Sequence, residues 1–348
     1  MSPDPSNLLD LEYAALAETL AKRGLPAYRA QQIWTAVFQQ LVTGYEQITT
    51  LPTALREALA DDLPLVVPDV VSIQRSADRR THKSLLRLHD GETVEVVAME
   101  YSERATVCVS TQAGCSVGCS LCATGTGGFR RDLATGEIIA QVLGAARAFR
   151  TRGRSLTNVV YMGMGEPLLN LDASIRSLQI LNDSRGLGLG ARSFTVSTVG
   201  IVPGIDRLSE IGLQVNLAVS LHAADDALRT HLVPINRTYP IDSLLAACRR
   251  YIARTRRRIT FEITLIDGVN DRPDDARAVS RRLSGLLCHV NLIPFNPFPG
   301  CPWTSSPSEA VDQYERILAA AGLPVSIRHS RGVEIQAGCG QLRSRTLP

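Results

Sequence analysis

The sequence predicts an α/β protein in which a partial (β/α)6 barrel follows a small helical unit and a β-hairpin. Three observations support this fold class. Apolar residues recur at helical spacing up to about residue 63, a hairpin pattern follows residue 64, and short apolar runs alternate with helical patterns from residue 105. Such alternation is typical of parallel strands joined by crossover helices, and these can close partly into a barrel.

The amino-terminal unit begins at Leu8 and shows helical spacing in YRAQQIWTAVFQQL, residues 28–41, with breaks expected at 23–26 and 49–52. After Pro64, KSLLRLHDGETVEVVAME alternates polar and apolar residues, and its DG pair at 90–91 predicts a hairpin turn. We expect four regions: a helical accessory domain at 1–64, a hairpin connector at 65–100, the barrel at 101–334 and a carboxyl-terminal segment at 335–348.

Seven apolar runs are the expected strands of the barrel region. They are ATVCVST (105–111), NVVYMGMG (158–165), SFTVSTVG (193–200), QVNLAVSLHA (214–223), RITFEITLI (258–266), HVNLIPFN (289–296) and PVSIRHS (324–330). In parallel barrels the chemistry lies at the carboxyl ends of the strands. A cysteine triplet follows the first run, GMGEP ends the second, and Ser197, Ser220, His222 and Asn296 end or follow later runs. These residues are therefore expected on one rim.

Composition and charge set broad limits on function. The 348 residues are 45% hydrophobic and 20% charged, which predicts a soluble globular protein, and the net charge of +3 neither requires nor excludes a polyanionic partner. No apolar run reaches the roughly 18 residues of a membrane span, and the amino terminus does not have the pattern of a signal peptide. We therefore expect a cytoplasmic protein, where clustered cysteines favour metal binding or catalysis over disulfides.

CSVGCSLC, residues 115–122, places three cysteines on one short loop. Structural zinc takes four ligands, and a cubane iron–sulfur cluster ordinarily takes four thiolates. Three cysteines would leave one iron open, and such an iron could chelate the amino and carboxylate groups of S-adenosylmethionine. The alternative is a zinc site completed by Cys108 or Cys339.

The triplet resembles the signature of the radical S-adenosylmethionine enzymes, in which it follows the first strand of a partial barrel. The resemblance implies one [4Fe-4S] cluster with an open iron site, held by Cys115, Cys119 and Cys122. It also implies that Gly165 and Glu166 of GMGEP bind the amino end of S-adenosylmethionine. Further cofactor-binding residues implied in the same way are Ser197, Ser220, Leu221, His222 and Asn296. The family usually has an aromatic residue where this chain has Leu121.

Over nearly the whole chain, from about Leu8 to Leu342, the sequence closely resembles the radical RNA methyltransferases that methylate carbon 2 of adenine. The stretches that carry this likeness are NVVYMGMGEPLLN, TVSTVG, LAVSLHA, HVNLIPFNP and AGCGQL. The resemblance implies two partners, 23S ribosomal RNA and transfer RNA, in which the target adenine lies beside the anticodon. A second branch of the family methylates carbon 8 of the ribosomal adenine and confers resistance, but Pro167 in MGMGEP fits the carbon 2 branch better.

Two cysteines outside the triplet complete the resemblance. It implies that Cys339 carries the methyl group as S-methylcysteine. One S-adenosylmethionine would methylate this sulfur, and a second would yield the 5'-deoxyadenosyl radical that activates it, so two are consumed per turnover. The methylene radical would crosslink to the RNA, and Cys108 would release the product by forming a disulfide with Cys339. Among Glu92, Glu95 and Glu100, Glu95 matches the family's proton acceptor.

The sequence also implies partners and leaves alternative functions open. A flavodoxin-like electron-donor protein is expected, together with a monomeric chain and no membrane contact. Basic clusters at 75–83, 129–131 and 249–258, with Arg23 and Arg29 of the helical unit, could dock RNA phosphates, although solvated faces would explain each of them singly. Trp34 is expected in the core of the helical unit. The alternatives are another radical S-adenosylmethionine reaction and an iron–sulfur electron carrier, and inability to cleave S-adenosylmethionine would favour the carrier.

Overall fold

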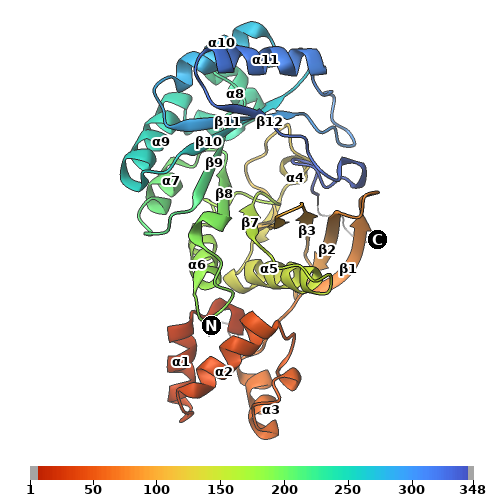
Figure 1. Ribbon diagram of the computed structural model, residues 1–348, viewed down its shortest axis with the longest axis vertical. Helices are drawn as coiled ribbons and strands as arrows, with labels where there is room; N and C mark the ends of the chain where they lie inside the picture. The colour runs from red at the N-terminus through yellow and green to blue at the C-terminus, as the bar shows by residue number, and fades with distance from the viewer. Residues whose placement is uncertain (1–6, 344–348) are drawn as a thin grey trace.

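The computed structural model describes residues 7–343. Residues 1–6 of the expected helical domain and 344–348 of the expected carboxyl-terminal segment lie outside this range. The described amino-terminal part forms a helical unit at one end of the molecule (Figure 1). Its elements are η1 (Leu8–Asp10), α1 (Tyr13–Lys22), α2 (Tyr28–Trp34), the π-helical turn η2 (Thr35–Gln40), η3 (Tyr45–Gln47) and α3 (Thr53–Asp62).

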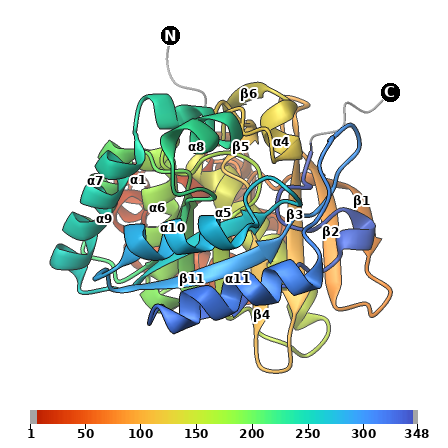
Figure 2. The same cartoon turned by 90° about the horizontal axis from the view of Figure 1, so that it is seen from above.

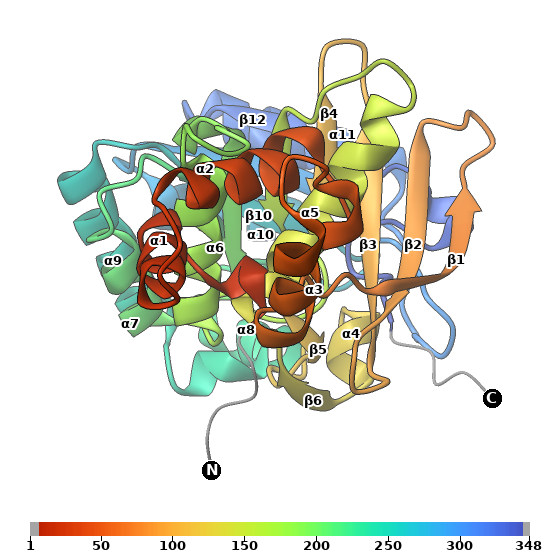
Figure 3. The same cartoon turned by 90° about the horizontal axis from the view of Figure 1, so that it is seen from below.

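Trp34 is fully buried in this unit, as expected, where it packs edge-on against Tyr13 with ring centroids 5.5 Å apart. The unit lies against helices α5 (Thr135–Arg150) and α6 (Leu171–Asn182), as the view from below shows (Figure 3). The Asp10 carboxylate accepts a 2.6 Å hydrogen bond from the Gly136 amide at the start of α5. At the other end of α5, Arg150 donates to the backbone carbonyls of Gln39 and Gln40.

A ten-stranded mixed sheet forms the rest of the fold, with the order β1-β2-β3-β4-β7-β8-β9-β10-β11-β12. The strands are parallel from β4 to β12 and antiparallel from β1 to β4. Their bounds are β1 (Asp69–Arg75), β2 (Thr81–Arg87), β3 (Thr93–Glu100), β4 (Ala105–Cys108), β7 (Asn158–Tyr161), β8 (Phe194–Thr198), β9 (Asn216–Ser220), β10 (Ile259–Leu265), β11 (Cys288–Pro294) and β12 (Val325–Ile327). Each of the seven expected runs overlaps one strand, and the predicted fold class is confirmed.

Helices cover the outer face of the parallel strands, as the view from above shows (Figure 2). Besides α5 and α6 they are α7 (Val202–Leu208), α8 (Asp226–Leu232), α9 (Ile241–Thr255), α10 (Pro273–Leu283) and α11 (Ser308–Ala320). Strand β10 shows how the core is built, because Ile259, Phe261, Ile263 and Leu265 alternate along it and are all fully buried in the main hydrophobic cluster. Alternation then directs the intervening polar residues into the barrel.

The hairpin β2–β3 has the predicted turn, but it does not stand apart from the barrel. Strand β3 pairs antiparallel with β4, and β1 adds a third strand beyond β2, so the hairpin continues the barrel sheet. Strand β1 was not predicted from the sequence. Nearly all of its residues are exposed, and a strand exposed on both faces need not alternate apolar with polar residues. No helix within residues 7–343 is both long and apolar enough to span a membrane.

The sheet remains open, with β1 and β12 at its two edges. After β12 the chain returns toward β2 and β3 through the turn η6 (Val333–Ile335), which Figure 1 shows beside these strands. There the Lys83 ammonium donates to the Gln336 carbonyl at 3.2 Å, and the Arg343 amide donates to the Glu95 carboxylate at 2.9 Å. We call residues 333–343 the terminal segment.

Candidate active site

The cysteine triplet lies on a loop closed by a small antiparallel pair of strands, β5 (Gln112–Gly114) and β6 (Phe129–Asp132). Gly114 has φ +76°, and a Cβ there would overlap the Gly128 carbonyl oxygen, so only glycine allows this closure. The Cys115 amide donates to the same carbonyl at 2.9 Å. After Cys122 the chain enters the short helix α4 (Ala123–Thr126). The local sequence thus holds the three thiols on one tight loop.

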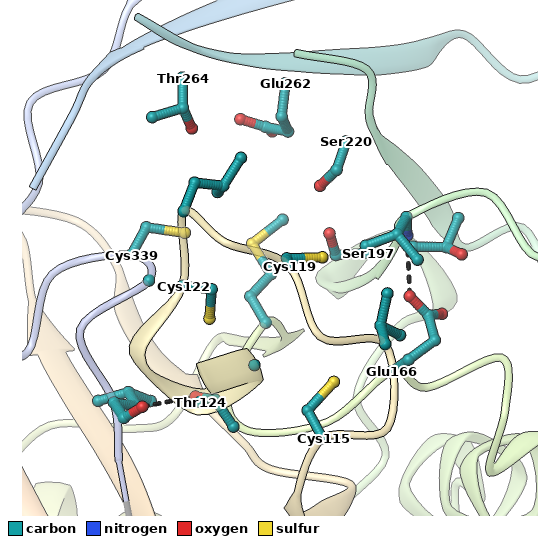
Figure 4. Close-up of a pocket in the computed structure, with 18 of the residues that line it drawn as sticks. Cys115, Cys119, Cys122, Thr124, Glu166, Ser197, Ser220, Glu262, Thr264 and Cys339 are labelled. Carbon is teal, nitrogen blue, oxygen red and sulfur yellow. Dashed lines mark hydrogen bonds between the residues drawn. The ribbon is translucent and has the colours of Figure 1, made fainter. Parts of the chain in front are cut away.

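This loop borders a cavity of about 140 Å³ at the carboxyl ends of the parallel strands, which we call the upper cavity (Figure 4). Loops or strand ends of β7, β8, β9 and β10 supply the opposite wall. The predicted residues that line it are Cys115, Cys119, Cys122, Gly165, Glu166, Ser197, Ser220, His222 and Cys339. The structure therefore brings together eight residues that the sequence placed on one rim, and adds Cys339 of the terminal segment to them.

The donor set of the triplet fits an iron–sulfur cluster better than a zinc ion. Burial raises the pKa of the Cys115 thiol to about 12 and that of Cys119 well above its usual value, and each thiol is further raised by the charge of its neighbours in the triplet. Yet among residues 7–343 no three His, Cys, Asp or Glu side chains converge closely enough to hold one metal ion. A zinc ion requires such convergence, whereas a cubane cluster presents a separate iron to each thiolate.

A buried cation lies near the triplet. Arg229 is completely buried and donates to the carbonyl oxygens of Val199 at 2.6 Å and Ser220 at 3.0 Å. Burial lowers the pKa of Arg229 to about 10, while the charge of Cys119 opposes this shift. The guanidinium therefore stays positively charged at neutral pH and can offset the negative charge of a thiolate-bound cluster.

Gly165 and Glu166 form a tight turn beyond β7. Gly165 has φ +97°, and a Cβ there would lie 2.5 Å from the Gln112 side chain. The Glu166 carboxylate accepts hydrogen bonds from the amides of Val199 and Leu168, at 2.8 and 2.9 Å. Burial nevertheless raises the pKa of Glu166 to about 7. The carboxylate is thus fixed at the wall of the cavity, and a cationic neighbour would stabilise its charged form.

His222 is held in a constrained conformation at the end of β9. Its backbone has φ +60°, and Asn270 fixes that turn by donating to the His222 carbonyl at 2.8 Å. The Nδ1 atom accepts from the Thr264 amide at 3.1 Å, so a neutral ring carries its proton on Nε2. Burial, reinforced by the charge of Arg229, lowers the pKa of His222 to about 3. The ring is therefore neutral and has one donor available.

Two of the expected cofactor-binding residues do not line the upper cavity. Leu221 is fully buried in the hydrophobic core. Asn296 instead supports the terminal segment, because its amide nitrogen donates to the Cys339 carbonyl at 3.1 Å and to the Ser330 hydroxyl at 2.7 Å. Leu121, where an aromatic residue was expected, does lie on the cavity wall and belongs to one apolar cluster with Phe295, whose ring lines the same cavity.

Cys339 joins the upper cavity to a second, smaller one. The side cavity has a volume of about 40 Å³ and contains Cys108, Cys339 and Arg328 in its wall. Cys339 is exposed, as expected, but the surface that it presents lines these cavities. Its backbone is held next to the triplet, since the Ala123 amide donates to the Gly340 carbonyl at 2.7 Å. The structure thus brings Cys108 and Cys339 to one small space.

In the side cavity, burial raises the pKa values of both cysteine thiols, whereas the Arg328 guanidinium lowers them. Burial raises the pKa of the Cys108 thiol to about 12, and the charge of Cys339 raises it further. Burial also raises the pKa of Cys339. The Arg328 guanidinium opposes both shifts. Burial alone would lower the pKa of Arg328, but the charges of Cys339 and Glu262 outweigh it and raise that pKa. Arg328 is therefore the cation that favours thiolates in this space.

Glu95 lies beside the cavities, outside the set of residues that line them. Its carboxylate is buried, forms an ion pair with the Lys83 ammonium at 2.9 Å and accepts the Arg343 amide of the terminal segment at 2.9 Å. The Ser110 hydroxyl donates to its backbone carbonyl at 2.7 Å. The expected proton acceptor is therefore a neighbour of the segment that carries Cys339.

Sequence reasoning missed Arg328 and Glu262, which both line the upper cavity. A signal was present for each. Arg328 directly follows the last strand, in the same position as the rim residues of the other strands, and Glu262 is a lone carboxylate within the apolar run RITFEITLI. The remaining cysteines fit structural roles, since Cys248 and Cys288 are buried in the main core and Cys301 is half-buried.

The three basic clusters have different surroundings. In 75–83, Lys83 is buried in its pair with Glu95, and in 129–131 the Arg131 side chain is paired with Asp90 and Glu137. The cluster 249–258 is divided. Arg250 and Arg254 pair with Asp206 and Glu210. A polar cavity of about 990 Å³ near the amino ends of the strands is lined by Arg256, Arg257 and Arg258 of this cluster and by Arg104. We call this the lower cavity, and Glu262 and Arg328 border both it and the upper cavity.

Known protein families match most of the chain. Residues 109–278 match the model of the radical SAM superfamily, and residues 6–64 match that of the ribosomal RNA large subunit methyltransferase N-terminal domain. Among curated proteins, the chain is 48% identical to a probable dual-specificity RNA methyltransferase RlmN of Chloroflexus aurantiacus, over 97% of this chain and 93% of that protein. It is 44% identical to dual-specificity RNA methyltransferase RlmN 1 of Myxococcus xanthus, over 99% and 96%.

A solved structure agrees with these relatives. The crystal structure of a radical SAM methyltransferase from Sphaerobacter thermophilus matches with a TM-score of 0.96 and 52% sequence identity, covering 97% of this chain and 99% of that one. The likeness includes both the helical unit and the barrel, since it extends over nearly the whole of both chains.

Proposed function

Because this chain belongs to the dual-specificity RNA methyltransferases of the RlmN type, which are radical SAM enzymes, we propose that it methylates carbon 2 of one adenine in 23S ribosomal RNA and of the adenine beside the anticodon in transfer RNA. One observation carries this proposal. Cys339 lies between the upper cavity, which is the proposed site of S-adenosylmethionine, and a small space that it shares with Cys108. A methyl carrier needs access to a donor, and its release needs a second thiol.

The superfamily implies a [4Fe-4S] cluster and S-adenosylmethionine as cofactors. Cys115, Cys119 and Cys122 would hold the cluster, with Glu166 and the turn at Gly165 near the amino end of the cofactor. When bound, such a cluster would supply the electron for cleavage of S-adenosylmethionine. The charge of Glu166 favours a cofactor ammonium, and the neutral His222 ring can donate from Nε2 to a cofactor oxygen or nitrogen.

Cys339 has two tasks in the proposed cycle. Its thiolate first takes a methyl cation from one S-adenosylmethionine by displacement, with Arg328 stabilising the thiolate. The resulting thioether then loses a hydrogen atom to the radical derived from a second molecule, and its methylene carbon adds to carbon 2 of the base. A radical route suits this carbon, because it is electron-poor and offers no lone pair to a methyl cation.

The second cysteine, Cys108, is proposed to release the product. The Cys108 thiolate attacks the sulfur of Cys339, so that a sulfur–sulfur bond forms and the sulfur–carbon bond breaks. The electron pair leaves with the carbon, which takes a proton and becomes the methyl group. Before this step the radical adduct must lose one electron, which the oxidised cluster would accept, and its ring proton, for which Glu95 is proposed as the acceptor. Lys83 and the Arg343 amide hold its carboxylate outside the lining of both cavities, so Glu95 must move toward the base before it can accept this proton.

We propose that the RNA base enters from the lower cavity. Arg104, Arg256 and Arg258 line it, and none of them forms an ion pair with another residue in the range 7–343, so their charges are available to phosphates. Glu262 and Arg328 line both this cavity and the upper one, so the proposed path runs past them. Only a base removed from its stack could reach Cys339 by this path.

Mass analysis of digested 23S ribosomal and transfer RNA, from cells with and without the gene, tests this function. We expect 2-methyladenosine in both RNAs only when the gene is present. The appearance of 8-methyladenosine would assign the chain to the resistance branch, and no difference at either carbon would overturn the proposal. A flavodoxin-like electron donor is proposed as well, and reconstitution with purified flavodoxin and its reductase tests it by the yield of methylated RNA.

A further inference from the structure

Glu262 is a buried carboxylate inside the barrel that the proposed cycle does not use. It is the fourth residue of β10, with 5% of its surface exposed. Its neighbours on the strand, Phe261 and Ile263, are fully buried in the core, so Glu262 points to the inner face. It lines both the upper and the lower cavity. In Figure 4 its side chain lies between those of Thr264 and Ser220, at the wall of the upper cavity.

The two carboxyl oxygens of Glu262 have different environments. Oε1 accepts a 3.0 Å hydrogen bond from the Asn291 amide, and Asn291 is itself oriented by the Ser326 hydroxyl, which donates to it at 2.8 Å. Oε2 is buried and has no hydrogen-bond partner among residues 7–343. No Lys, Arg or His of that range forms an ion pair with this carboxyl group either.

A buried oxygen without a hydrogen-bond partner indicates a position where a ligand binds. Leaving a buried polar atom unsatisfied destabilises the protein, and more so if the atom is charged. Burial raises the pKa of Glu262, against the opposing effects of Arg328 and Asn291, which favours the neutral acid. In the protonated form of the group the proton belongs on Oε2, since Asn291 donates to Oε1. The group then offers one donor, at Oε2, beside one acceptor, at Oε1.

This donor–acceptor pair complements the edge of adenine. Adenine has an acceptor at N1 next to a donor at the 6-amino group, whereas guanine has a donor at N1 next to an acceptor at O6. We propose that Glu262 reads the target adenine, with Oε2–H donating to N1 and Oε1 accepting from the 6-amino group. The inference rests on the proposed function, because it concerns the base that this function modifies.

The hydrogen bond from Glu262 to N1 would also favour addition of the methylene radical to carbon 2. Carbon 2 is bonded to N1, so a hydrogen bond donated to N1 withdraws electron density from it. The methylene radical on Cys339 is rich in electrons, and therefore adds more readily to an electron-poor carbon. The position is suitable, since Glu262 and Cys339 line the same cavity. Glu262 would thus be both a recognition residue for adenine and an activating one.

The test compares an RNA hairpin that carries adenosine at the target position with one that carries purine riboside, which lacks the 6-amino group. Each is incubated with the reconstituted enzyme, and RNA methylation is counted per molecule of S-methylated Cys339, so that failure at the earlier step is recognised. Since a bidentate base contact discriminates by about tenfold to a hundredfold, the wild type should prefer adenosine by that factor. Glu262→Ala should lose both rate and preference.

Glu262→Gln is the rescue variant, because an amide is neutral and still offers a donor beside an acceptor. It should keep most of the preference for adenosine. Glu309→Gln, an exposed glutamate on α11, is the control for loss of a carboxyl group and should resemble the wild type. If the wild type treats both RNAs alike, or if Glu262→Ala keeps the wild-type preference, the inference is overturned. If the wild type methylates neither RNA, the proposed function itself fails.

Discussion

The ammonium group of Lys83 lies 2.9 Å from the carboxylate of Glu95, and both side chains are about 95% buried. Each partner also holds one part of the terminal segment, since Lys83 donates to the Gln336 carbonyl and Glu95 accepts from the Arg343 amide. Cys339 lies between these two points. One buried ion pair on neighbouring strands thus positions the segment that carries the proposed methyl acceptor.

Replacing Lys83 with methionine should therefore destabilise the protein and loosen the terminal segment. The change leaves the Glu95 carboxylate buried without its cation, and breaking a buried pair in this way costs about 3–5 kcal/mol. Urea unfolding measures the stability, and hydrogen exchange of residues 333–343 measures the loosening. The matched control is Lys22→Met, because Lys22 forms a solvent-exposed pair with Glu18, and such a pair contributes little to stability. Equal loss in the two variants would contradict this role for Lys83.

The parts of the fold that could be predicted from sequence are those with a local signal. Short apolar runs marked every parallel strand, and the polar residues that end those strands marked the rim. The DG pair likewise marked the hairpin turn. The roles of Lys83 and Asn296 could not be predicted, because each contacts residues of the terminal segment that are far away in sequence, about 250 positions for Lys83 and Gln336. Only the folded chain shows such pairs.

Removing the Cys108 thiol should stop the proposed cycle after the RNA has been crosslinked. In Cys108→Ala, nothing in the side cavity can attack the sulfur of Cys339, so RNA covalently bound to the protein should accumulate and 2-methyladenosine should fall to background. Denaturing gels of labelled RNA measure the adduct. Cys339→Ala should give neither adduct nor product, and Cys301→Ala, a half-buried cysteine outside the side cavity, should resemble the wild type. A Cys108→Ala enzyme with normal turnover would exclude the disulfide step.

Release of the crosslink should accelerate as pH rises. Burial disfavours the charged thiolate of Cys108 and raises its pKa to about 12, so the thiol is almost wholly neutral at pH 7. Below the pKa the thiolate fraction grows about tenfold for each pH unit, and only the thiolate attacks. The decay of preformed crosslink at pH 7, 8 and 9 should show this slope. A decay rate that is independent of pH would show that another step controls release.

Gly165→Ala should abolish binding of S-adenosylmethionine. The new Cβ would lie 2.5 Å from the Gln112 side chain, at φ +97°, so both the packing and the backbone oppose it, and the turn that carries Glu166 must move. Equilibrium binding of S-adenosylmethionine to the reconstituted protein measures the effect. The control is Gly190→Ala, where φ is −59° and the Cβ would meet open space. That change should be neutral or stabilise the protein by about 0.4–1 kcal/mol. Unchanged binding in Gly165→Ala would mean that the turn does not contact the cofactor.

Reversing charge at the lower cavity should weaken RNA binding in a salt-dependent way. Arg104 and Arg258 line this cavity, and if each of them neutralises a phosphate, each contributes about 0.7–0.9 to the slope of log affinity against log salt. Arg258→Ala should therefore reduce that slope by nearly one, and Arg258→Glu should weaken binding further through repulsion. Arg277→Ala on α10 is the control, because its guanidinium is exposed and already paired with Asp274. Titration of a transfer RNA anticodon hairpin at several salt concentrations gives the slopes. Equal slopes for Arg258→Ala, Arg277→Ala and the wild type would place the RNA on another face of the protein.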